Sequence, residues 1–270
     1  MTELIYQHEL IKVFQDTVHQ SNTLYAKETE ILKKETKLYQ NIPVYPSKST
    51  TSDVAFIHGG TIEISNQYCD RYKVAALNFA DGVMPGGMVK EGALTQEENI
   101  CRCSNLYQSL TSEACIEGYY KINQQHYHSG LCTNTIIYSP NVLVFKDDKN
   151  FSPITPKQYD IITCPAPSCK FTCTQDAMNV YETRIKQILL SAIINHVDCL
   201  ILGAWGCGAF GQDKKLISLA FVNALNEYAG YFKKIIFAIK ETPTLHDSSY
   251  DAFLQIFQTN YRGNTLKGDK

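Results

Sequence analysis

Hydrophobic residues recur along this chain with two spacings, one typical of strands and one typical of helices. Short apolar runs bounded by turn residues predict strands at 54–57, 74–78, 136–145, 159–163, 199–203 and 233–239. Apolar residues at helical spacing predict helices at 61–72, 100–110, 175–195, 213–228 and 250–257. This alternation of strands and helices indicates an α/β domain with a largely parallel sheet.

The N-terminal segment has a different pattern from the rest of the chain. Met1 to about Asn41 is rich in Glu, Lys, Gln and Leu and predicts one or two amphipathic helices, which Pro43 and a Ser/Thr run at 47–52 bring to an end. We therefore expect a helical N-terminal extension over residues 1–50 and a larger α/β domain over residues 51–270. Within that domain, the polar and aromatic stretch 118–131 predicts an irregular connection, and 136–145 predicts two short strands around Pro140.

Two of the predicted strands run into glycine-rich loops that precede helices. The first loop contains Pro85, Gly86 and Gly87, and the second spans Gly206 to Gly211. Such loops direct backbone N–H groups and a helix N-terminus into one concavity, which favours a bound anion such as a phosphate. One glycine loop is a weak signal, but two loops at strand ends of one sheet could hold a diphosphate from both sides.

Two adjacent carboxylates, Glu97 and Glu98, lie where the helix after the first loop begins. The sequence from Thr95 to Glu98 fits a capping box, in which the glutamate would bind the N-cap backbone. Alternatively, one glutamate would meet a glycosidic or ester bond of a ligand whose phosphates lie on the neighbouring loops. Both interpretations can hold, each for a different glutamate.

Composition limits the classes of partner. The 270 residues are 44% hydrophobic, enough for a substantial core, and 25 basic against 27 acidic residues give a formal charge of −2. This balance provides no basic field for duplex nucleic acid, so a phosphate-bearing ligand would be held by local groups. The ten cysteines lack paired zinc knuckles and no signal peptide precedes them, which predicts reduced thiols in a cytoplasmic or nuclear protein.

Several short motifs occur together along the chain: Asn78-Phe79-Ala80, Pro85-Gly86-Gly87, Gln96-Glu97-Glu98, Tyr138-Ser139-Pro140, Cys164-Pro165-Ala166-Pro167 and Gly203-Ala204-Trp205-Gly206-Cys207-Gly208. On these motifs the chain resembles the microbial-type poly(ADP-ribose) glycohydrolases over nearly its whole length. In that family a glycine triplet is followed, after a short spacer, by Gln-Glu-Glu; here Met88 takes the place of the third glycine. The resemblance implies a three-layer α/β/α macrodomain-like mixed sheet with a helical N-terminal extension.

The resemblance also implies an activity and a set of site residues. It implies an ADP-ribosyl glycohydrolase that cleaves the bond at the distal ribose, with Glu98 as catalytic acid/base, Glu97 at the ribose or leaving group, and Asn78 holding the ribose. The other substrate-binding residues implied are Gly86, Gly87, Met88, Gln96, Gly206, Cys207, Gly208, Ala209, Phe210 and Gly211. No cofactor or metal is expected. The expected partners are ADP-ribose and ADP-ribosylated protein or poly(ADP-ribose). The protein is expected to act as a monomer and to bind neither duplex nucleic acid nor a membrane.

The sequence leaves the linkage and the reaction class open. Asp81, together with Glu97 and Glu98, could surround a guanidinium, which would suit arginine-linked ADP-ribose; alternatively, Asp81 is a turn residue that caps its own loop. We place polymer or O-linked hydrolysis ahead of arginine-linked hydrolysis. A reader that binds ADP-ribose without cleaving it, and a phosphatase that uses the same two loops, are the remaining alternatives.

Overall fold

The computed structural model describes residues 2–126, 131–167, 174–208, 210–240 and 248–267. Its strands are β1 (Lys37–Tyr39), β2 (Val54–His58), β3 (Val74–Ala80), β4 (Ile136–Lys146), β5 (Pro153–Pro165), β6 (Cys199–Leu202), β7 (Lys234–Ile239) and β8 (Thr265–Lys267). Within the described residues they form one eight-stranded sheet in the order β1-β4-β5-β3-β6-β7-β2-β8. β4 runs antiparallel to β1 and β5, and the other neighbours are parallel, so the sheet is mixed.

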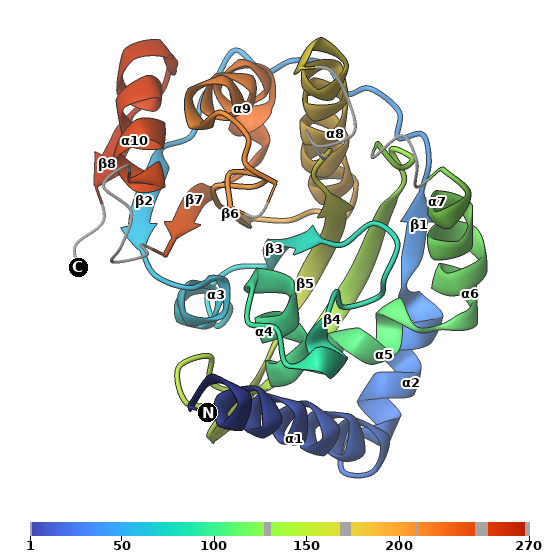
Figure 1. Cartoon of the computed structure of the whole chain (residues 1–270). Coiled ribbons are helices and arrows are strands. Elements are labelled where there is room, and N and C mark those ends of the chain that lie inside the picture. Colours follow the sequence, from blue (N-terminus) through green and yellow to red (C-terminus); the bar gives the residue numbers. More distant parts are fainter. Residues whose placement is uncertain (1, 127–130, 168–173, 209, 241–247, 268–270) are drawn as a thin grey trace.

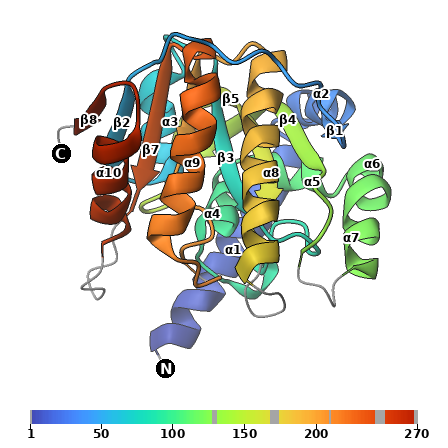
Figure 2. The same ribbon diagram turned by 90° about the horizontal axis from the view of Figure 1, so that it is seen from above.

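Helices cover both faces of this sheet (Figures 1 and 2). They are α1 (Thr2–Asn22), α2 (Ala26–Glu35), α3 (Thr61–Tyr68), η1 (Val89–Glu91), α4 (Gln96–Cys103), α5 (Leu106–Leu110), α6 (Glu113–Cys115), η2 (Ile116–Tyr120), α7 (Lys121–Gln125), α8 (Thr174–Ile194), α9 (Lys214–Tyr228), η4 (Ala229–Tyr231) and α10 (Ser249–Asn260). In Figure 1, α8, α9 and α10 lie on one face and α1, α3, α4 and α5 on the other. The predicted three-layer α/β/α fold is confirmed.

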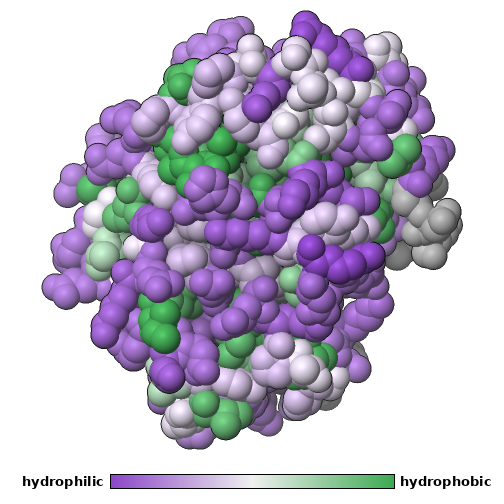
Figure 3. Space-filling view, turned by 180° about the vertical axis from the view of Figure 1, so that it is seen from behind, coloured by the Kyte–Doolittle hydropathy of each residue, from purple (hydrophilic) through white to green (hydrophobic). Residues whose placement is uncertain are grey.

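The central strand β3 shows why the sequence forms this sandwich. Its residues alternate between the two cores: Ala75 and Leu77 pack with α8 to α10, whereas Val74 and Ala76 pack on the opposite side. A strand that is covered on both faces reads as a continuous apolar run, which is the pattern seen here. Hydrophilic residues cover most of the face shown in Figure 3, where hydrophobic residues form small separate groups.

The structure corrects four element predictions. The stretch 118–131 was expected to be irregular; its residues 127–130 lie outside the described part of the chain, and the rest contains part of the π-helical turn η2 and all of α7. The two strands expected around Pro140 are one strand, β4, with a register shift between Ser139 and Val142. Pro140 has no N–H to donate and Asn141 adopts a positive φ of 52°, so the chain forms a bulge there instead of a turn.

The third correction concerns the N-terminal segment, where helix gives way to strand earlier than expected. α2 ends at Glu35, and Lys37–Tyr39 form the edge strand β1, which pairs with β4 through Leu38 and Ile137.

The fourth correction concerns the predicted helix over 100–110, which is divided into α4 and α5. Asn105 interrupts it because its backbone N–H donates to Leu143 O at 3.1 Å and its Oδ1 accepts from the Leu143 N–H at 2.9 Å.

Candidate functional site

Both glycine loops lie at the carboxyl edge of the sheet, where β3 and β6 separate. β3 pairs with β6 only as far as Ala76, whereas its pairing with β5 continues to Ala80. At the end of β6, Gly203 packs so closely that a Cβ there would lie 2.8 Å from the Phe79 ring. Open α/β sheets bind ligands beyond the carboxyl ends of neighbouring strands, and this edge has that geometry.

The first glutamate of the pair, Glu97, lies beneath the loop that follows β3. Its side chain is buried, with 2% of its surface exposed. Oε1 accepts from Asn78 Nδ2 at 3.1 Å, and Oε2 accepts from the Asp81 backbone N–H at 2.6 Å. Burial raises the pKa of Glu97 well above its ordinary value of 4.5; the two hydrogen bonds oppose the rise, and the charges of Asp81 and Glu98 add to it.

The second glutamate, Glu98, joins the start of α4 to the glycine loop. It forms the predicted capping box with Thr95, whose backbone N–H lies 3.1 Å from Oε2 and whose hydroxyl donates to the same oxygen. Its Oε1 accepts the Met88 backbone N–H at 3.0 Å. The capping interpretation is therefore confirmed for Glu98, and the bond from Met88 adds a contact that a capping box alone does not need.

The glycines of the first loop permit a close approach to both carboxylates. Gly86 and Gly87 have positive φ values of 73° and 57°. A Cβ on Gly87 would lie 2.5 Å from Glu98 Oε1 and 3.3 Å from Glu97 Oε2, so a side chain at this position would collide with the glutamate pair. Met88 has a φ of −95°, a conformation that does not require glycine, and its side chain is 49% exposed.

Two further predicted residues, Gln96 and Asp81, use their side chains to bind the protein's own backbone. Gln96 Oε1 accepts from the Phe79 N–H at 2.8 Å, and its Nε2 donates to Leu77 O at 2.7 Å, which fastens α4 to β3. Asp81 Oδ1 accepts the N–H groups of Val83 and Met84 at 2.8 and 2.9 Å. This is the turn role that the sequence left open for Asp81.

Asn78 places an unused acceptor next to the glutamates. It is fully buried, and its Nδ2 also donates to Thr163 Oγ1 at 3.2 Å. Its Oδ1 has no hydrogen-bond partner within the described residues. Buried acceptors are rarely unpaired, so this atom is available to a ligand hydroxyl. Thr163 was not predicted, because only the register of β5 beside β3 places it opposite Asn78.

The second loop combines one closely packed glycine with an open outer surface. Gly206 has a φ of 83°, and a Cβ there would lie 1.9 Å from Tyr181 Oη. At Gly208 and Gly211, a Cβ would meet no described atom within 4 Å. Phe210 and Cys207 are half-buried on this loop, and burial raises the pKa of Cys207 to about 12. Ala209, predicted to bind substrate, lies outside the described residues.

Other candidate features of the sequence have plain structural roles. Trp205 is a core residue, and its Nε1 donates to Cys164 O at 3.1 Å. The eight cysteines in the described part of the chain are free thiols. In that same part, no group of three or more His, Cys, Asp or Glu residues is placed to hold a metal ion. No described helix is both long enough and apolar enough to span a bilayer.

Comparison with known proteins identifies the family of this site. A family model described as the microbial-type PARG catalytic domain, where PARG is poly(ADP-ribose) glycohydrolase, matches residues 10–147. The chain belongs to this family. The PARG match runs from α1 to the end of β4 and includes the first glycine loop and both glutamates, whereas the second glycine loop follows it in the sequence. A comparison with curated proteins gave no match.

Solved PARG structures share the fold of this chain. The enzyme from Deinococcus radiodurans in complex with ADP-ribose is 28% identical, with a TM-score of 0.76, over 86% of this chain and 97% of that one. PARG from Thermomonospora curvata is 24% identical, with a TM-score of 0.81, over 93% of this chain and 100% of that one. A further structure of the Thermomonospora enzyme contains the inhibitor ADP-HPD. The similarity extends well beyond the residues that the family model matches.

Proposed function

We propose that this PARG-family chain is an ADP-ribosyl glycohydrolase, which cleaves the glycosidic bond at the distal ribose of ADP-ribose attached to a polymer or a protein. The observation that carries the proposal is the close packing of Gly87 on the carboxylates of Glu97 and Glu98, which brings a phosphate-binding type of loop into contact with two potential proton-transfer groups. The ADP-ribose complex of the Deinococcus enzyme supports the ligand class.

ADP-ribose would lie across the two glycine loops with its diphosphate between them. The Gly86 N–H on one side, and N–H groups of the Gly206–Gly211 loop on the other, would supply the donors, whereas the Gly87 N–H already donates to Met84 O at 3.0 Å. The half-buried Phe210 would lie under the ribose, and Asn78 Oδ1 would accept a ribose hydroxyl. One copy of the chain supplies both loops and both glutamates, so a monomer is sufficient.

The chemistry follows from the charge that develops at the distal ribose. Breaking the glycosidic bond builds oxocarbenium character on the sugar and negative charge on the leaving oxygen, which needs a proton. In our proposal Glu98 gives that proton and then accepts one from the attacking water, while Glu97 holds the ribose. Burial raises the pKa of Glu97, so this carboxyl retains a proton at a pH where an exposed glutamate has lost it.

The structure favours a leaving oxygen over a leaving guanidinium. Hydrolysis of arginine-linked ADP-ribose would need the Asp81 carboxylate to bind the substrate guanidinium. However, Asp81 Oδ1 already accepts the N–H groups of Val83 and Met84. A carboxylate that caps a turn is less free to receive a cationic substrate. We therefore propose poly(ADP-ribose) or O-linked mono-ADP-ribose as substrate.

The test is release of free ADP-ribose from three substrates: poly(ADP-ribose), a serine-linked and an arginine-linked mono-ADP-ribosylated protein. Wild type and Glu98→Gln are compared, with Glu113→Gln as the matched control, because Glu113 is an exposed glutamate in the first turn of another helix. We expect Glu98→Gln to lose about 10²–10⁴-fold in turnover and to retain ADP-ribose binding. Glu113→Gln is expected to match wild type.

Each other outcome points to a different function. Release from the arginine conjugate alone would overturn the proposed linkage and make Asp81 part of the site. Measurable ADP-ribose binding without release by wild type would identify a reader. Release of inorganic phosphate in place of ADP-ribose would identify a phosphatase.

A further inference from the structure

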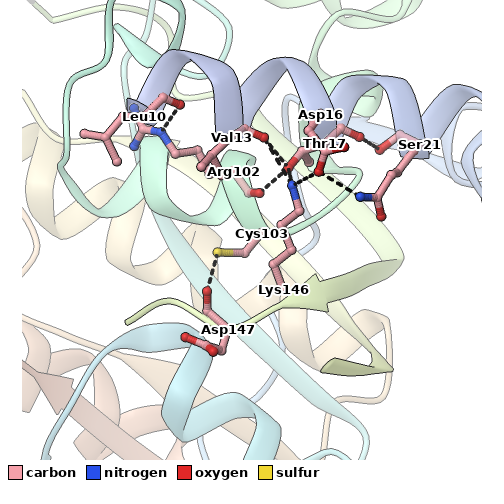
Figure 4. A network of polar contacts seen from close by, with 10 residues as sticks. Leu10, Val13, Asp16, Thr17, Ser21, Arg102, Cys103, Lys146 and Asp147 are labelled. Atoms are coloured by element: carbon pink, nitrogen blue, oxygen red, sulfur yellow. Dashed lines mark hydrogen bonds and ion pairs between the residues drawn. The ribbon is translucent and has the colours of Figure 1, made fainter. Parts of the chain in front are cut away.

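A buried arginine connects the N-terminal helix to the loop beneath which the glutamates lie, and Figure 4 shows its contacts with α1. Arg102, on α4, has no exposed surface. Its Nε donates to Leu10 O of α1 at 3.2 Å, and its Nη2 donates to Val89 O at 3.5 Å and to Ala93 O. The guanidinium therefore binds one carbonyl on α1 and two on the segment between the glycine loop and α4.

The segment that Arg102 binds also supplies the backbone donors to Glu98. Val89 and Ala93 belong to a tight turn closed by the bond from the Ala93 N–H to Met88 O at 3.1 Å. At the two ends of this segment, Met88 and Thr95 donate their N–H groups to Glu98. Fixing this turn therefore fixes both donors relative to the carboxylate.

Helix α1 packs against the same turn from outside. Gly92, at φ 81°, lies so close to α1 that a Cβ there would be 2.7 Å from Gln7 O. The Thr17 hydroxyl donates to Arg102 O, so α1 contacts both the guanidinium and the backbone of Arg102. The turn is thus held between α1 and α4.

The positive charge of Arg102 is also favoured by Glu98. Within the described residues its hydrogen-bond acceptors are backbone carbonyls, and its Nη1 has no partner. Burial lowers the pKa of Arg102, and the negative charge of Glu98, one helical turn earlier, is the main effect that opposes this. Because an uncompensated buried cation is costly, the nearby charge of Glu98 helps to stabilise Arg102 in its charged form.

We infer that Arg102 is a positioning residue for Glu98 and acts on it through the turn at 88–95. Because Arg102 also binds α1, this helix becomes part of the support of the active site. This inference rests on the proposed function for its effect on turnover. Its structural effect, an ordered turn with both donors in place, does not depend on any reaction.

The experiment compares Arg102→Met and Arg102→Lys with Lys146→Met. Lys146 is the matched control because it is also buried and also binds α1: its Nζ lies 2.7 Å from Asp16 Oδ2, 2.7 Å from Thr17 Oγ1 and 3.2 Å from Val13 O. None of these contacts involves the turn at 88–95. Hydrogen exchange of the Met88 and Thr95 amides is measured alongside kcat, KM and Tm.

We expect both methionine variants to lower Tm, because each leaves α1 less firmly held. Only Arg102→Met is expected to lower kcat, by about 10–100-fold with little change in KM, and to speed exchange of both amides at least about tenfold. Arg102→Lys keeps the charge without the planar fork and is expected to recover part of kcat. If Arg102→Met does not fold, the same comparison is made with Arg102→Lys. The kcat of this variant is then expected to be lower than that of wild type but still measurable.

Equal effects of the Arg102 and Lys146 variants on kcat and amide exchange would overturn the inference, because Arg102 would then only anchor α1. Unchanged kcat and exchange in a folded Arg102 variant would also overturn it. A wild type without turnover would instead contradict the proposed function, and the amide exchange would still decide the role of Arg102.

Discussion

Glu97 and Glu98 are neighbours in sequence with different surroundings. Both are buried, but Glu97 is bound by one amide side chain and one backbone N–H, whereas Glu98 caps its helix and is bound by Thr95 and Met88. The pKa of Glu97 is raised chiefly by burial. When two adjacent carboxyl groups differ in this way, they are suited to different roles in proton transfer.

The raised pKa of Glu97 gives stability a specific pH dependence. Because its folded pKa exceeds the unfolded value near 4.5, the proton binds the folded state more tightly. The contribution of Glu97 to stability is therefore complete below that unfolded value and is lost as pH rises through the folded pKa. Glu97→Gln cannot ionise, so the Tm of wild type minus that of the variant is expected to fall as pH increases above 4.5. Thermal melts across the pH range measure this difference, and a constant difference would show that Glu97 titrates normally.

Single residues differ in how far the sequence predicts their roles. The capping box could be predicted because its residues lie close together in the sequence. The turn role of Asp81 was recognised as one option because its partners also follow it directly. Thr163 and Arg102 were not predicted. Their partners are 85 and 92 residues away in the chain, Asn78 for Thr163 and Leu10 for Arg102; the pairing of β3 with β5 brings the first pair together, and the packing of α1 on α4 the second.

Among the elements, the first glycine loop makes the strictest geometric demand. It must adopt positive φ and also pass within contact distance of two carboxylates. The second loop has the same backbone requirement at Gly211, at φ 64°, but no described atom lies near a Cβ there. The two positions therefore separate backbone strain from steric collision.

We predict that Gly87→Ala is more destabilising than Gly211→Ala. Both substitutions place a Cβ at positive φ, which costs about 1–2 kcal/mol. Gly87→Ala adds overlap with Glu98 Oε1, 2.5 Å from the new Cβ, and overpacking of this kind costs about 1–3 kcal/mol more. Urea unfolding of both variants measures the difference. Equal free energies of unfolding would mean that the loop moves away from Glu98 at little cost.

The elements were predicted best where hydrophobic periodicity alone decides the structure. β2, β3, β7 and the long helices α8 and α9 lie close to their predicted bounds, because each buries one or both faces in the core. The break at Asn105 and the bulge at Asn141 could not be read in this way. Both arise from contacts between segments, Asn105 with Leu143 and Asn141 with Asp160, that override local propensity.

At the scale of the whole molecule, the N-terminal segment is built into the fold. The sequence indicates an extension over residues 1–50, because composition changes at the prolines that follow. In the structure, Leu10 and Phe14 of α1 are buried, and the Phe14 ring packs edge-on against Tyr107 with centroids 4.9 Å apart. Composition shows where a segment ends, but it does not show whether the segment shares a core with its neighbour.

We therefore predict that deletion of residues 1–22 destabilises the whole domain. The deletion removes Phe14 from the core, and loss of a buried phenylalanine side chain alone costs about 3–5 kcal/mol. It also removes Asp16, the ion-pair partner of Lys146, and Leu10 O, a hydrogen-bond acceptor of Arg102. For a domain of this size we expect Tm to fall by more than about 10 °C, with Phe14→Ala intermediate. A truncated chain that melts at the wild-type temperature would instead show that α1 is a separable extension, and that the contacts of Arg102 with α1 contribute little to the fold.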